Sequence, residues 1–129
     1  MTREATGQNA VRLRAAALGC ALWRNNSGSL LDKDGRMVRF GLGNDSAALN
    51  AVWKSSDLIG IVPVTIRPEH VGLTFGVFAA IEMKAPGWHL TPGDARGQAQ
   101  SRFIEQVRSL GGIGGFCTSA DEFERMVRG

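Results

Sequence analysis

Residues 75–84 read Phe-Gly-Val-Phe-Ala-Ala-Ile-Glu-Met-Lys, and this stretch decides which folds the chain can adopt. Apart from one glycine, its first seven residues are all apolar. Such continuous hydrophobicity is typical of a strand buried on both faces, at the centre of a sheet that helices cover. The stretch is too short to cross a membrane, which takes about 20 apolar residues. It therefore predicts a central strand that ends in a charged pair, Glu82 and Lys84.

The segments before this strand predict a helix, a hairpin and a second apolar strand. Residues 4–18 are rich in Ala and Arg, which favour a helix. Turn-forming residues at 32–36 predict a hairpin whose second strand contains Val38. Residues 58–66 are rich in β-branched side chains, which favour a strand with a bend at Pro63.

The segments after the central strand alternate between helix and strand. Proline and glycine predict a loop at residues 86–97, and apolar spacing predicts a helix at 98–110. A strand is expected at residues 113–117, followed by a helix capped by Ser119. The expected fold is therefore α/β, with a mixed central sheet flanked by helices. Its length suits one domain, residues 1–129.

The charge balance is slightly basic and unevenly composed. The 129 residues include 15 Lys and Arg against 12 Asp and Glu, a formal net charge of +3. All but three of the cations are Arg, whose guanidinium pairs with two phosphate oxygens at once, so the bias suits a nucleic-acid partner. A GC-rich genome produces the same bias. Cys20 and Cys117 lack metal-ligand spacing and there is no apolar signal segment, so we expect a reduced protein in the cytoplasm, without membrane association.

Glu82 and Lys84 form the first candidate site. Residues two apart on a strand project to the same face, so the two charges lie side by side at the strand's end. A carboxylate there can bind Mg²⁺, and an ammonium can contact a phosphate oxygen or an attacking water. The backbone carbonyl of Met83, between them, offers a further hard oxygen. The alternative is an ion pair that merely closes the strand, because acid-x-Lys triplets also arise by chance.

Asp57, at the start of the other apolar strand, is the second candidate acid. If the two apolar strands pair as antiparallel neighbours, the start of one meets the end of the other, and Asp57 lies beside Glu82. Two adjacent carboxylates repel each other unless a divalent cation lies between them. The alternative for Asp57 is a turn residue that caps its own backbone.

In this order and spacing, Asp57, Glu82 and Lys84 resemble the PD-(D/E)xK nuclease pattern, with Ser-Ser-Asp in place of the usual Pro-Asp. More specifically, residues 4 to about 127 resemble a stand-alone VRR-NUC domain, the virus-type replication-repair nuclease. The resemblance implies a restriction-endonuclease-like core and a bacterial or phage-infected host cell. It is carried by the following segments: Glu4-x-x-x-Gln8, Trp23-Arg24-Asn25-Asn26-Ser27-Gly28, Ser56-Asp57-Leu58-Ile59-Gly60, Ile81-Glu82-Met83-Lys84, and Gln100-x-x-Phe103-Ile104 leading to Gly111-Gly112.

The resemblance also implies roles for individual residues. Asp57, Glu82 and the Met83 carbonyl would hold Mg²⁺ or Mn²⁺, and Lys84 would orient the water or neutralise charge on the phosphate. Glu4 matches the family's N-terminal acid, which would support the metal; the alternative is a helix-start Glu that the helix dipole stabilises. Gln100 would position the lysine, the water or the phosphate. Gln98 competes for that role, but the residues after Gln100 fall at the family's distances.

Further polar residues suit DNA contacts. Arg24, Asn25 and Asn26 would clamp the sugar-phosphate backbone, or else satisfy their own turn. Trp88 and His89 follow the motif and could touch a base or phosphate, although an isolated loop histidine is usually only solvated. The glycines at 111–115 follow a helix and lack a Lys-Ser/Thr pair, which disfavours a P-loop and nucleotide hydrolysis.

Together these observations predict a Mg²⁺- or Mn²⁺-dependent endonuclease that hydrolyses phosphodiester bonds in duplex or branched DNA. Stand-alone members of the family act as homodimers on branched DNA such as four-way junctions, so we expect the same assembly here. The alternative is a non-catalytic DNA-binding or assembly module that keeps the nuclease fold. A small-molecule phosphohydrolase is disfavoured because no nucleotide-cradling loop is present.

Overall fold

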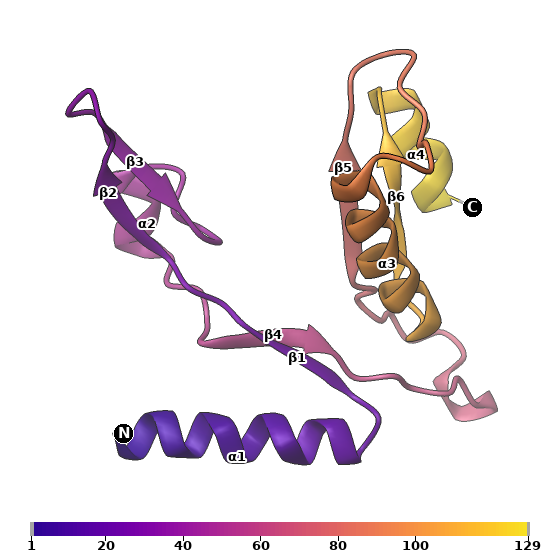
Figure 1. The fold of residues 1–129 in the computed structure, drawn as a ribbon. Coiled ribbons are helices and arrows are strands. Elements are labelled where there is room, and N and C mark those ends of the chain that lie inside the picture. The colour runs from indigo at the N-terminus through magenta and orange to yellow at the C-terminus, as the bar shows by residue number, and fades with distance from the viewer. Residues whose placement is uncertain (1, 129) are drawn as a thin grey trace. The chain divides into compact units, whose positions relative to one another are not determined.

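The computed structural model describes residues 2–128, which form a mixed α/β structure with four α-helices and three small two-stranded sheets (Figure 1). The chain divides into two compact units, residues 1–60 and 61–129, and each is described by itself. The organisation of residues 1–129 as one domain stays a prediction. No helix in the described part of the chain is long and apolar enough to span a membrane.

The first unit begins with helix α1 (Arg3–Ala17), whose first turn is capped by the Thr2 hydroxyl accepting from the Ala5 N–H. Strand β1 (Ala21–Arg24) pairs with β4 (Leu58–Ile61). Strands β2 (Gly28–Leu31) and β3 (Met37–Phe40) form the antiparallel hairpin that the turn at residues 32–36 predicted. The short helix α2 (Ala47–Val52) follows the hairpin.

Asn44 ties the hairpin to the loop after it. It is 4% exposed, and its amide donates to the carbonyls of Gly28, at 2.7 Å, and Phe40, at 3.0 Å. Its side-chain oxygen accepts from the Arg39 guanidinium at 2.8 Å. The Asn44 side chain thus links the open end of the hairpin through three hydrogen bonds, and a buried amide of this kind is costly to leave unpaired.

The second unit has a strand–helix–strand–helix order (Figure 1). Strand β5 (Ala79–Met83) pairs in parallel with β6 (Ile113–Cys117), and helix α3 (Ala95–Ser109) connects them. The pairing places Glu82 opposite Phe116. Helix α4 (Ala120–Arg128) then packs on β6, and the Ser119 hydroxyl accepts from its Glu122 N–H as the sequence predicted.

Helices α3 and α4 cover opposite faces of the β5–β6 pair. A Cβ atom added at Gly114 would lie 3.1 Å from Ile104 on α3, whereas one at Gly115 would lie 2.6 Å from Met126 on α4. Adjacent strand residues point to opposite faces, so each helix has a face of its own. The two glycines therefore allow both helices to approach the strand closely.

The predicted strands are shorter in the structure than in the sequence analysis. The second apolar strand ends at Ile61, before Pro63, because a proline cannot donate to a strand ladder. The strand predicted to be central and buried covers only Ala79–Met83, and residues 75–78 precede it without regular structure. It belongs to a two-stranded sheet and is only partly buried, so its central position is not confirmed. Helix α3 starts three residues earlier than expected, since Asp94 caps it by accepting from the Gly97 N–H.

The antiparallel pairing considered for the two apolar strands is not among the strand pairs of residues 2–128. Strand β4 pairs with β1, and β5 pairs with β6. The apolar strand β5 is instead completed by a parallel neighbour that the chain reaches through α3, which is the usual way to join parallel strands. Asp57 and Glu82 therefore belong to different strand pairs.

Removing the Asn44 side chain should destabilise the hairpin. We expect Asn44→Ala to lower the free energy of unfolding by about 1–3 kcal/mol, because two backbone carbonyls and the Arg39 guanidinium lose a buried partner. Urea unfolding monitored by circular dichroism measures the change. Asn50→Ala is the matched control, because Asn50 accepts a hydrogen bond only from the exposed Lys54 ammonium. Equal effects of the two substitutions would contradict this role of Asn44.

Candidate functional site

Glu82, Phe116 and Lys84 share one face of the β5–β6 pair, the face that α3 covers. Phe116 lies two residues after Gly114, which faces α3, and is the register partner of Glu82. Lys84 continues the ladder beyond β5, since its N–H donates to the Cys117 carbonyl at 2.8 Å. Its ammonium then lies 5.8 Å from the centre of the Phe116 ring. Glu82 and Lys84 therefore project to the same side, as their spacing predicted.

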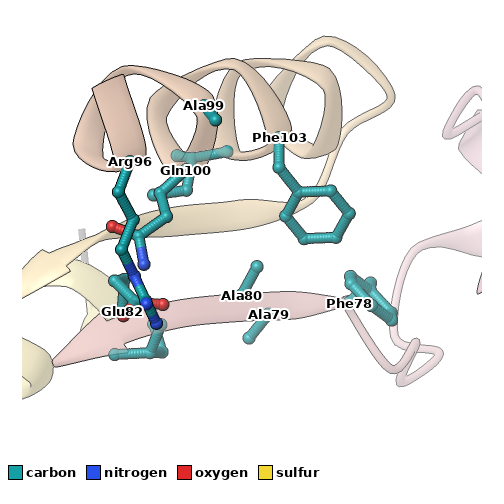
Figure 2. A pocket seen from close by; sticks show the side chains of 10 residues that line it. Phe78, Ala79, Ala80, Glu82, Arg96, Ala99, Gln100 and Phe103 are labelled. Carbon is teal, nitrogen blue, oxygen red and sulfur yellow. The ribbon is translucent and has the colours of Figure 1, made fainter. Parts of the chain in front are cut away.

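A cavity of about 630 Å³ lies between β5 and α3 (Figure 2). One end is polar, because Arg96 and Gln100 reach from α3 toward Glu82 on β5, as Figure 2 shows. Arg96 and Gln100 are four residues apart, which places them on one face of the helix. The rest of the cavity is apolar, with Ala79, Ala80, Ile81, Ala99, Ile104 and the rings of Phe78 and Phe103.

Gln100 presents an unsatisfied acceptor at this polar end. Its Oε1 atom is buried and has no hydrogen-bond partner among the described residues. By contrast, the amide of Gln98 donates to the Thr91 carbonyl at 2.9 Å and so stabilises the loop before α3. A buried acceptor without a partner costs stability, which native proteins tolerate mainly where a ligand, water or ion completes it. The two glutamines therefore differ: the Gln98 amide is bonded to the backbone, whereas Gln100 keeps an acceptor without a partner among the described residues.

Lys84 contacts aromatic rings and makes no ion pair with Glu82 in the described part of the chain. Its ammonium lies 5.0 Å from the centre of the Trp88 ring and 5.8 Å from that of Phe116. The two rings pack on each other with centroids 4.6 Å apart. The ion pair considered as an alternative for Glu82 and Lys84 is thus not what holds the end of the strand.

The first unit brings together two other groups of predicted residues. The Asn25 N–H donates to the Asp57 carbonyl at 2.9 Å, and its side-chain amide donates to the Ser56 carbonyl at 2.8 Å. The first of these bonds extends the β1–β4 pairing by one step beyond Arg24. The Asp57 side chain is exposed next to this segment. Asn25 therefore donates both of these hydrogen bonds to backbone carbonyls, whereas Arg24, Asn26 and the Asp57 carboxylate are exposed.

The proposed metal ligands are distributed over both units. Glu4 is exposed in the first turn of α1, and Asp57 also belongs to residues 1–60, whereas Glu82 and Met83 belong to residues 61–129. Within residues 2–128, no group of three or more His, Cys, Asp or Glu side chains is gathered closely enough to hold a metal ion. The metal set stays a prediction. Glu82 and Gln100 both line one cavity, and carboxylate and amide oxygens are hard donors of the kind that Mg²⁺ and Mn²⁺ prefer.

Two residues of this site were not identified from the sequence. Arg96 was placed in a loop, and only its spacing of four from Gln100 could have indicated a shared helix face. Phe116 was assigned only to a strand, and its contact with Lys84 depends on the parallel register. Trp88 packs against Phe116 and Lys84, while His89 is exposed.

No protein-family model matches the chain, and no curated protein or solved structure is significantly similar to it. The functional conclusion therefore depends on the chemistry of the residues themselves. A carboxylate, a glutamine with an unpartnered amide oxygen and the cation Arg96 line one cavity, and the cation Lys84 lies on the same face of the sheet as the carboxylate. This is a set that can bind a hard cation and an anion together.

Replacing Gln100 should separate ligand binding from stability. We expect Gln100→Leu to leave the free energy of unfolding unchanged or to raise it by about 1 kcal/mol, because a buried unpaired acceptor is removed. Gln98→Leu, the matched control, should lower it by about 0.5–1.5 kcal/mol because its bond to the Thr91 carbonyl is lost. Urea unfolding without divalent metal measures both. A larger loss for Gln100→Leu than for Gln98→Leu would show that Gln100 is structural.

Proposed function

We propose that the protein is a Mg²⁺- or Mn²⁺-dependent endonuclease that hydrolyses phosphodiester bonds in DNA. The observation that carries the proposal is the cavity at whose polar end Glu82, Gln100 and Arg96 converge, with Lys84 on the same face of the sheet. The resemblance of these residues to the PD-(D/E)xK pattern supports the same chemistry. The strand–helix–strand arrangement of β5, α3 and β6 is compatible with a restriction-endonuclease-like core, which we include in the proposal.

Glu82 and the Met83 carbonyl would hold the divalent metal, and Asp57 and Glu4 are included in the proposed set on the resemblance alone. When bound, such an ion activates water and stabilises the charge that develops on a phosphate. Gln100 Oε1 is buried without a partner, so it can accept a hydrogen bond from a water molecule at the same end of the cavity. The bond that occupies Gln98 and the unpartnered acceptor of Gln100 support Gln100, rather than Gln98, as the proposed positioning residue.

The cationic residues would bind and neutralise the phosphate. Lys84 carries a compact ammonium, which can approach a non-bridging oxygen and stabilise the negative charge of the transition state. Arg96 is exposed at the mouth of the same cavity, and no carboxylate among the described residues pairs with it. Its guanidinium fork can therefore hold two oxygens of a phosphate. Of the three residues expected to clamp the DNA backbone, the exposed Arg24 and Asn26 would contact it, whereas Asn25 donates to the carbonyls of Ser56 and Asp57.

The substrate and assembly follow from the family resemblance. We propose a VRR-NUC domain that acts as a homodimer on branched DNA such as four-way junctions, in the cytoplasm of a bacterial or phage-infected cell. A two-fold axis relates two identical sites, which suits paired cuts in a symmetric junction. Linear duplex DNA is the alternative substrate. Comparing the cleavage rates of a four-way junction, a flap and a linear duplex identifies the preferred one.

Removing either charge of the motif should abolish cleavage. We expect Glu82→Gln and Lys84→Met each to lower kcat by at least about 100-fold on a branched DNA, because metal binding or transition-state neutralisation is lost. Gel-based cleavage assays with Mg²⁺ or Mn²⁺ measure the rates, and circular dichroism checks the fold. Glu105→Gln is the matched control, because Glu105 is exposed on α3 and pairs only with Arg108.

Melting in the presence of metal distinguishes this enzyme from a non-catalytic DNA-binding module. If the protein is a nuclease, Mg²⁺ or Mn²⁺ should raise the melting temperature of the wild type. It should leave the melting temperature of Glu82→Gln unchanged, since only the native site binds the ion. Full cleavage by Glu82→Gln or Lys84→Met would refute the proposed site. DNA binding without any metal-dependent cleavage would favour the binding module.

Arg96 should contribute to DNA binding rather than to metal binding. In a Lys84→Met background, we expect Arg96→Gln to weaken DNA binding about tenfold and to reduce the salt dependence of log K by about one phosphate contact. Fluorescence anisotropy at several salt concentrations measures both quantities. Arg102→Gln is the matched control, because Arg102 is exposed on the same helix but does not line the cavity. Equal losses for the two substitutions would remove Arg96 from the site.

A further inference from the structure

The turn after β5 folds back onto the motif lysine. Residues 85–88 read Ala-Pro-Gly-Trp, and the Trp88 N–H donates to the Ala85 carbonyl at 3.1 Å. Proline in the second position and glycine in the third are what a type II turn requires, and Gly87 has φ of +84°. A side chain at position 87 would be strained in this conformation. The turn therefore returns Trp88 to the side of Lys84, four residues earlier.

Trp88 meets a second ring supplied by the neighbouring strand. Phe116 is opposite Glu82 in the parallel ladder, so its ring lies on the same face as the carboxylate. The two rings are 4.6 Å apart and tilted by 42°. Both are partly buried, as is Lys84. The lysine thus meets one ring placed by the local turn and another placed by the register of β5 and β6.

The Lys84 ammonium lies within the range of a cation–π interaction with both rings, at 5.0 Å and 5.8 Å from their centres. A lysine ammonium stands on a flexible four-carbon stem, and ordering that stem costs conformational entropy. Two ring faces attract the charge without the fixed geometry of a carboxylate. The aromatic pair can therefore restrict the ammonium while leaving its three N–H groups free to donate to a ligand.

We infer that Trp88 and Phe116 are positioning residues that hold the Lys84 ammonium by cation–π contact on the face of the sheet that carries Glu82. A carboxylate partner would cancel the charge that the proposed reaction needs, whereas the rings keep it. The catalytic part of this inference rests on the proposed nuclease function. The placement of the ammonium does not, and it has a spectroscopic signature of its own.

Lysine-selective ¹³C labelling tests the placement directly, because the chain has only three lysines, Lys33, Lys54 and Lys84. Protons near ring faces resonate upfield, so the ε-methylene signal of Lys84, assigned with Lys84→Arg, should lie upfield of its usual position. Trp88→Leu and Phe116→Leu should each move it back, and Trp88→Phe should retain most of the shift. Trp53→Leu, at a residue 65% exposed in the first unit, should leave it unchanged.

Cleavage kinetics test the consequence for the reaction. We expect Trp88→Leu to lower kcat about threefold to thirtyfold with little change in KM, the range given by a cation–π contact. Trp88→Phe should retain most of the wild-type rate. This difference from Trp88→Leu would show that the aromatic ring itself matters to the rate. Trp53→Leu should retain the wild-type rate.

Each of the two tests can fail independently of the other. A Lys84 signal at its usual position in the wild type, or one that Trp88→Leu and Phe116→Leu leave in place, would overturn the inference whatever the activity. A displaced signal together with full kcat in Trp88→Leu would overturn the catalytic part. If the wild type cleaves no DNA while the Lys84 signal is shifted as described, the proposed function is refuted and the aromatic positioning stands.

Discussion

The parallel ladder between β5 and β6 is the interaction on which the candidate site depends. Its register sets Glu82 opposite Phe116 and lets the Lys84 N–H reach the Cys117 carbonyl. A shift of one residue would turn Glu82 to the other face, where α4 packs, and would separate it from Gln100. The side chains of the site come from the strand, the helix and the turn, but the ladder decides which of them meet.

Several polar groups of the candidate site have no pairing partner among the described residues. Gln100 Oε1 is buried without a partner, and the charges of Glu82, Lys84 and Arg96 form no ion pairs with one another in the described part of the chain. A sequence selected for stability alone would pair or replace the buried acceptor, because an unsatisfied buried group lowers the free energy of unfolding. The presence of Glu82, Arg96 and Gln100 in the lining of one cavity favours a ligand-binding role over a purely structural one.

Much of the local structure could be predicted from the sequence, but the pairing of its strands could not. Composition located α1, apolar spacing located most of α3 and the Ser119 cap located α4, because these signals lie within a few residues of each other. Continuous hydrophobicity identified β5 but overestimated its length and its burial, since residues 75–78 are apolar without belonging to a ladder and β5 is only partly buried. The choice between parallel and antiparallel neighbours depends on long-range contacts, and hydrophobic pattern alone does not encode them. For this reason Phe116 was not identified, whereas the shared face of Glu82 and Lys84 was. Arg96 was missed because α3 begins three residues earlier than predicted.

Lysine at position 84 suits this arrangement of rings, and it says more about the site than the overall charge does. Twelve of the fifteen cations are arginine, and Lys84 is the one lysine in residues 61–129. A guanidinium is broad and planar and stacks flat on rings, which would spread its donors along the aromatic pair. An ammonium is a compact charge that can rest against two rings and still point its donors toward one oxygen. In a chain whose cations are mostly arginine, a lysine against Trp88 and Phe116 is therefore more informative than the net charge of +3, which a biased genome explains equally well.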